Sequence, residues 1–295
     1  MRINPRALAL LAFAQAAIGA AAIFARFALT GGGPIAVSAF RLLIAAIPVA
    51  LVALLRGAYR CFDAPTERRL AFAGLMLAAH FALWIASLRF ASVAVSTLLV
   101  CSTPIWTELY AVARARKVRR DVLASLLTAS IGVLIVTGAP SKNETPLGIG
   151  LALGGAIAIA AYLVLVRASN ARYSTLAVVG RTYPTAALIL LGTSFALHDP
   201  VPSGSNTLAW SGILAMALVS QLFGHTALNA AVRQFSPTFV ATVTLIEPAI
   251  AAALAAVIFG ERLGLTTLAG SLFILIGIGL ALRAERQGLP NVKHG

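Results

Sequence analysis

The sequence predicts an all-α integral membrane protein with ten transmembrane helices, arranged as two inverted repeats of five helices each. Three observations support this prediction: the composition, the spacing of long apolar runs, and a nearly constant offset between matching residues in the two halves. Of the 295 residues, 60% are hydrophobic and 11% are charged, whereas a soluble domain carries about 25% charged residues. A chain of this composition is typical of a protein that lies in a lipid bilayer.

A helix needs roughly twenty apolar residues to cross a bilayer, and the sequence contains ten runs of about that length. The first run follows Arg2 and Arg6 and so resembles a signal peptide. Because nine further runs come after it, we interpret it as a retained first helix rather than a cleaved leader. The ten runs lie near residues 7–25, 34–55, 70–88, 92–113, 121–138, 147–166, 175–196, 208–230, 237–259 and 264–283.

Basic residues in the connecting segments predict the orientation in the membrane. Seventeen of them fall on the side of the N-terminus and four on the other side. Since basic loops mark the cytoplasmic side, we expect a multi-pass membrane protein with both termini in the cytoplasm. The same loops explain the net charge of +14. They lack interleaved aromatic residues, so no nucleic-acid partner is expected.

Matching residues in the two halves indicate an internal repeat. His225 lies 145 residues after His80, and Pro248 lies 144 residues after Pro104. We assign the first five-helix repeat to residues 1–140, the second to 141–286 and a cytoplasmic tail to 287–295. Because five is an odd number, the second copy enters the bilayer in the opposite direction. Inverted repeats of this kind enclose a substrate site near the midplane.

Three motifs support a resemblance to a known family. They are Arg41-Leu42-Leu43-Ile44-Ala45-Ala46, Ser102-Thr103-Pro104, and Glu247-Pro248 followed by Gly260-Glu261-Arg262-Leu263. On these motifs the whole chain resembles the EamA-type branch of the drug/metabolite transporter superfamily. It is most similar there to exporters of aromatic and broad-range amino acids. The chain departs from the family pattern at Arg116-Lys117, where the family often repeats the Gly-Glu pair.

The resemblance implies ten helices in two inverted halves and the export of amino acids or other small metabolites from bacteria. It thus also implies a location in the bacterial inner membrane. It also implies a central cavity, lined mainly by the first, third, fourth, sixth, eighth and ninth helices, with the fifth and tenth helices at the periphery.

Polar and aromatic side chains inside the predicted helices are candidates for substrate binding. A polar stripe facing lipid is costly, so these side chains should point into the bundle. Residues four apart share a helical face, which groups His80 with Trp84 and groups three residues of the eighth helix. Hydrogen bonding between helices is the alternative interpretation. The candidates are His80, Trp84, Tyr162, Gln221, His225, Asn229 and Glu247.

Glu247 precedes Pro248 near the middle of the ninth run. A carboxylate at this depth has three possible roles: it accepts a substrate ammonium group, relays a proton, or pairs with an intramembrane arginine. A proline removes one helical hydrogen bond. We therefore expect Pro104 and Pro248 to be the points at which helices bend during gating.

Other intramembrane charges have simpler interpretations. Arg41 and Arg181 lie six or seven residues inside their helices. A guanidinium there can hold a carboxylate, but two equivalent arginines favour a structural role at the helix ends. Glu108 lies close to Arg114, which favours a salt bridge near the membrane surface.

The function predicted from these observations is a small-molecule exporter working by alternating access, not an enzyme. The sequence contains no nucleophile motif, phosphate-binding loop or metal-ligand spacing, so no cofactor or metal is expected. Two alternatives stay open: efflux of lipophilic cations with Glu247 as the counter-charge, and a scaffold or channel without transport. Proton coupling through His80, His225 and Glu247 is also open.

Overall fold

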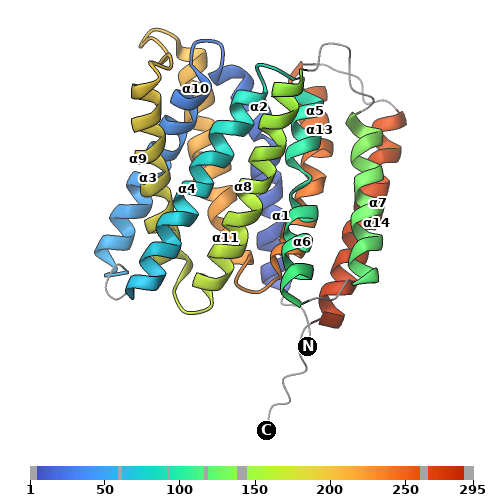
Figure 1. Cartoon of the computed structure of the whole chain (residues 1–295). Coiled ribbons are helices and arrows are strands. Elements are labelled where there is room, and N and C mark those ends of the chain that lie inside the picture. Colours follow the sequence, from blue (N-terminus) through green and yellow to red (C-terminus); the bar gives the residue numbers. More distant parts are fainter. Residues whose placement is uncertain are drawn as a thin grey trace.

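The computed structural model describes residues 5–58, 62–91, 93–115, 119–137, 145–259 and 265–288. Every regular element in these ranges is a helix, and the helices run side by side in one bundle (Figure 1). Cys61, Arg116-Lys117, the motif Gly260–Leu263 and the tail beyond Gly288 lie outside the described residues.

The elements are given in chain order. They are α1 (Pro5–Gly19), α2 (Ala21–Ala28), α3 (Pro34–Leu55), α4 (Ala64–Ser87), α5 (Val93–Val100), α6 (Thr103–Ala115), α7 (Arg120–Thr137), α8 (Pro146–Asn170), α9 (Thr175–Ala196), α10 (Thr207–Ala215), the π-helix η1 (Met216–His225), α11 (Thr226–Ala231), α12 (Pro237–Val243), the 3-10 turn η2 (Thr244–Ile246), α13 (Glu247–Phe259) and α14 (Leu265–Gly288).

Seven helical segments in the described part of the chain are long and apolar enough to cross a membrane. The three other predicted runs, near 92–113, 121–138 and 237–259, are also helical but do not meet the same criteria. The multi-pass membrane protein is therefore confirmed, and the number of ten spans stays a prediction. The seven segments are Pro5–Ala28, Pro34–Leu55, Ala64–Ser87, Pro146–Asn170, Thr175–Ala196, Thr207–Ala231 and Leu268–Gln287.

Short polar residues begin several of these helices. The side chain of Asp63 accepts a hydrogen bond from the backbone N–H of Thr66 at 3.0 Å, at the start of α4. Ser236 does the same for Phe239 at 3.1 Å, at the start of α12. Each cap satisfies a backbone donor that a helix leaves free in its first turn. Ser236 is followed by a proline, which the first helical position accepts without loss.

The two halves interlock. α3 packs on α9 and α7 packs on α14, and each of these pairs joins equivalent helices of the first and second halves. α6 packs on α12, which belongs to the equivalent span of the second half. α4 packs on α8, while α1 and α2 pack on α10 and η1. In the repeat, α4 corresponds to α10 with η1, and α8 corresponds to α1 with α2. The contact between α4 and α8 is therefore the counterpart of the contact of α10 and η1 with α1 and α2. α1 begins at the lower end of the bundle and α8 begins at the upper end (Figure 1), as an inverted repeat requires.

α7 and α14 form a pair at one side of the bundle (Figure 1). Two glycines allow their backbones to approach closely. A Cβ added to Gly277 would lie 2.6 Å from the backbone nitrogen of Ala129, and one added to Gly132 would lie 2.6 Å from that of Ile274. Small residues at such contacts are typical of membrane helix pairs. The close contact makes α7 and α14 a tightly packed pair at the periphery of the bundle.

Candidate functional site

A central cavity lies between the two halves. It is lined by residues of α1, α2, α4, α5, α6, α8, η1, α11, η2 and α13, which make up the six spans that the family resemblance implied, and α3 adds Arg41. The free volume of this cavity is about 60 Å³. That is room for a few waters, so a larger solute requires the cavity to widen.

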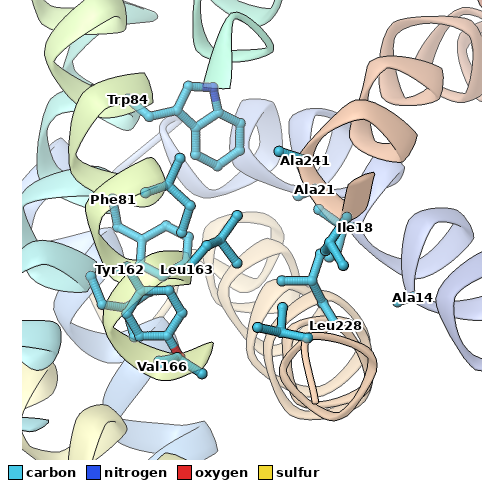
Figure 2. Close-up of a cluster of buried hydrophobic side chains, with 14 of the residues drawn as sticks. Ala14, Ile18, Ala21, Phe81, Trp84, Tyr162, Leu163, Val166, Leu228 and Ala241 are labelled. Atoms are coloured by element: carbon cyan, nitrogen blue, oxygen red, sulfur yellow. The ribbon is translucent and has the colours of Figure 1, made fainter. Parts of the chain in front are cut away.

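The apolar wall of this cavity is aromatic on one side. Trp84, Phe81 and Leu163 lie on one side of the region, and Ile18 and Leu228 lie on the other (Figure 2). All five side chains are buried. An aromatic and aliphatic surface of this kind suits the side chain of a small organic solute.

His80 is held in one orientation by its neighbours. Its Nδ1 lies 3.0 Å from the carbonyl oxygen of Gly155, and its ring stacks on Trp84 with an interplanar angle of 10°. Because Nδ1 must donate to that carbonyl, a neutral His80 has an unprotonated Nε2 that accepts hydrogen bonds. His225 also lines the cavity, with its ring edge against Phe81 at 5.3 Å between centroids.

Arg41 is a cavity residue that the sequence interpretation assigned to structure. Its Nε donates to Oε1 of Gln221 at 3.2 Å, and its guanidinium carbon lies 3.9 Å from the centroid of the Phe81 ring. The side chain is fully buried. Its position inside an apolar run was the available signal, since an intramembrane charge is a functional candidate by default.

Arg181, the expected counterpart of Arg41, lies elsewhere. It forms an ion pair with Glu67 at 2.8 Å, and both side chains are partly exposed. This contact ties the second turn of α9 to the first turn of α4. For Arg181 the structural interpretation is therefore confirmed.

Glu247 lines the cavity together with Arg41. It is the first residue of α13 and is partly exposed. Among the described residues the ion pairs found are Arg119–Asp121 and Arg181–Glu67, and neither involves Glu247. The cavity thus holds one acidic and one basic side chain that do not form a direct ion pair.

Three of the predicted site residues lie behind the cavity wall. The Tyr162 hydroxyl donates to Oδ1 of Asn229 at 2.9 Å, and Nδ2 of Asn229 donates to the carbonyl oxygen of His225 at 2.8 Å. Gln221 contacts Arg41 as described. None of the three residues lines the cavity. The structure therefore brings His80, Trp84, His225 and Glu247 together at the cavity and places Tyr162, Gln221 and Asn229 in a supporting hydrogen-bond layer.

The two candidate bending prolines lie directly after breaks in their helices. Pro104 is the second residue of α6 and follows the turn at Cys101–Ser102, while Pro248 is the second residue of α13 and follows η2. The breaks approach each other at the cavity, where Sγ of Cys101 lies 3.9 Å from the carbonyl oxygen of Thr244.

The π-helix η1 is a feature that the sequence did not predict. It spans ten residues and carries both Gln221 and His225. π-Helical turns often occur at functional sites. Here the turn belongs to the helix that contacts Arg41 and the cavity from the second half.

A second cavity lies between α6, α7, α12 and α14. Its free volume is about 210 Å³, and its lining includes Glu108, Arg119 and Glu285. The Glu285 carboxylate accepts two hydrogen bonds of 2.6 Å, from the backbone N–H and the hydroxyl of Ser236. Glu108 does not form the predicted ion pair with a basic residue in the described part of the chain.

The comparisons with known proteins agree with this architecture. The model of the EamA-like transporter family matches residues 6–138 and again residues 146–283. An uncharacterized transporter of Clostridium kluyveri is 25% identical over 190 residues, which cover 62% of this chain and 61% of that protein. One crystal structure is similar with a TM-score of 0.78 at 18% identity, covering 96% of this chain and 99% of that chain. At this identity the crystal structure shows the fold alone.

Proposed function

The chain belongs to the EamA-like transporter family, and from this premise we propose that it exports amino acids of broad, including aromatic, range across the bacterial inner membrane. The observation that carries the proposal is Glu247, a carboxylate that forms no ion pair with the described residues and that lines a cavity with an aromatic wall. A carboxylate at membrane depth binds an ammonium group through charge-assisted hydrogen bonds. Trp84 and Phe81 accommodate the side chain.

The mechanism that we propose is alternating access. The cavity lies between two interlocked halves, which supports alternating access around a central site. The halves then rock so that the cavity opens to one side at a time. Helices α5–α6 and α12–α13 bend at the breaks before Pro104 and Pro248. The basic loops orient both termini toward the cytoplasm.

The test is efflux from proteoliposomes loaded with labelled phenylalanine. We expect saturable efflux, and we expect Glu247→Gln to reduce it roughly tenfold or more, because one hydrogen bond to a charged group is worth about 1.5–3 kcal/mol. Glu67→Gln is the matched control, since Glu67 pairs with Arg181 away from the cavity. It should leave the efflux rate nearly unchanged.

Two further arms of the same experiment separate the alternatives. Efflux of the lipophilic cation tetraphenylphosphonium without amino-acid efflux would replace the proposal by cation efflux. Absence of any saturable flux would favour a scaffold or channel. An imposed pH gradient that drives phenylalanine uphill would identify proton antiport.

A further inference from the structure

Arg41 presents two guanidinium nitrogens that the described residues do not satisfy. Nη1 and Nη2 are buried and have no hydrogen-bond partner in the part of the chain that the structure describes. The whole side chain is 0% exposed. A buried charge without a partner is strongly destabilising, so a protein retains one where an anion binds or a charge moves.

The rest of the guanidinium is held firmly. Nε donates to Gln221 from η1, and the group lies over the Phe81 ring. These two contacts fix the plane from one edge and one face, leaving the edge with Nη1 and Nη2 free. Arg41 lines the central cavity, and because the side chain is fully buried, a solute meets this edge when the cavity widens. A planar pair of N–H donors matches the two oxygens of a carboxylate.

No carboxylate of the described residues forms an ion pair with Arg41. Glu247 lines the same cavity but does not form an ion pair with Arg41 in the described structure. Asp121 and Glu67 do form ion pairs, but their partners are Arg119 and Arg181. The unpaired edge of Arg41 and the separate Glu247 together form a site with one positive and one negative end.

We infer that Nη1 and Nη2 of Arg41 bind the carboxylate of the transported solute, so that the carried class is small organic acids, with amino acids as the members that also engage Glu247. This inference rests on the proposed transport function and adds a chemical requirement to it. A solute without a free carboxylate leaves the buried guanidinium unpaired. Lipophilic cations are disfavoured because the positive charge of Arg41 repels them.

The experiment compares four solutes of one shape in proteoliposome counterflow with the wild-type protein: phenylalanine, phenylalaninamide, phenethylamine and 3-phenylpropionate. We expect phenylalanine to be preferred over the amide and the amine by roughly ten- to a hundredfold, as expected for a lost pair of hydrogen bonds to a charged group. We expect 3-phenylpropionate to be carried more weakly than phenylalanine but better than the amine.

Arg41→Gln should reduce the preference for carboxylates to about twofold or less, and Arg41→Lys should retain part of it because the charge remains while the planar fork is lost. Arg181→Gln is the matched control: it removes the arginine expected at the equivalent position, which lies in an ion pair away from the cavity. Its selectivity should equal that of the wild type. Size-exclusion profiles verify that each variant is folded, and the wild-type comparison stands without any variant.

The outcomes distinguish the two proposals. Equal counterflow of phenylalanine and phenethylamine would overturn the carboxylate site and leave amino-acid transport intact. Carboxylate preference retained in Arg41→Gln would overturn the assignment to Arg41. Counterflow of 3-phenylpropionate but not of phenylalanine, lost in Arg41→Gln, would support the site while refuting amino-acid export. No counterflow of any of the four solutes would overturn both.

Discussion

Polar side chains around the central cavity form two layers that differ in their contacts. The inner layer, with His80, His225, Arg41 and Glu247, faces the cavity. The outer layer, with Tyr162 and its hydrogen-bond partners, holds the helices that carry the inner layer. Substitutions in the inner layer should therefore change transport, and substitutions in the outer layer should change stability.

Tyr162→Phe tests this division at the scale of a residue. It removes the hydroxyl that donates to Asn229 at 2.9 Å and keeps the ring. We expect the protein to lose about 0.6–1.5 kcal/mol of stability, the range for hydrogen bonds between membrane helices. The affinity for phenylalanine should stay within about twofold, because the hydroxyl lies outside the cavity. Thermal unfolding in detergent and counterflow measure the two quantities, and a selective loss of affinity would place Tyr162 in the binding site instead.

The sequence identified many of these residues but not their arrangement. His80, Trp84, His225 and Glu247 were predicted as site residues from their type and spacing, and the structure places all four at the cavity; their substrate role stays a prediction. Arg41 and Arg181 have the same local pattern, so only the fold separates a cavity residue from the partner of Glu67. Helical spacing grouped Gln221, His225 and Asn229 on one face, but of the three the structure places His225 alone at the cavity wall.

At the scale of the element, the close pair α7–α14 depends on small residues. Gly277→Ala places a Cβ 2.6 Å from the backbone of Ala129, which forces the two helices apart. We expect a loss of about 1–3 kcal/mol, as for other overpacked contacts. Gly279→Ala on the same helix is the control, because nothing lies within 4 Å of its added Cβ. It should be neutral or slightly stabilising, since alanine favours a helix by about 1 kcal/mol over glycine.

Thermal unfolding of both glycine variants in the same detergent gives the comparison. A Gly277→Ala protein as stable as Gly279→Ala would mean that α7 and α14 do not pack as closely as the structure describes.

The break before Pro248 is expected to serve conformational change rather than stability. Pro248→Ala restores a backbone donor and favours a continuous helix through η2. We expect counterflow to slow roughly fivefold or more while the unfolding temperature stays the same or rises. Pro184→Ala is the control, because Pro184 lies inside α9, which does not line the cavity. Equal rates for the two variants would remove the gating role from Pro248.

The elements themselves were largely predictable. Each of the ten apolar runs falls on helix in the described structure, because lipid burial requires every backbone group to be satisfied within the helix. The subdivision of the ninth run into α12, η2 and α13 was foreseen only through its proline. The π-helix had no signal in the sequence, and the structure shows it packed against α1 and α3.

At the scale of the whole molecule, the two interlocked halves share the central cavity. The two halves make corresponding contacts with each other, and both contribute residues to the cavity wall. Contacts at both ends join the halves. At one end Asp199 accepts hydrogen bonds of 2.8 Å from the backbone N–H groups of Ile35 and Ala36, and at the other end Arg181 pairs with Glu67.

Accessibility of Cys101 from the two sides of the membrane tests alternating access most directly. Cys101 is a buried free thiol on the cavity wall, and Cys61, the only other cysteine in the sequence, can be replaced by serine. In sealed vesicles of known orientation, alternating access predicts that a membrane-impermeant thiol reagent labels Cys101 from either side, and that saturating phenylalanine slows labelling from both. Labelling from one side only, unaffected by phenylalanine, would contradict transport through this cavity.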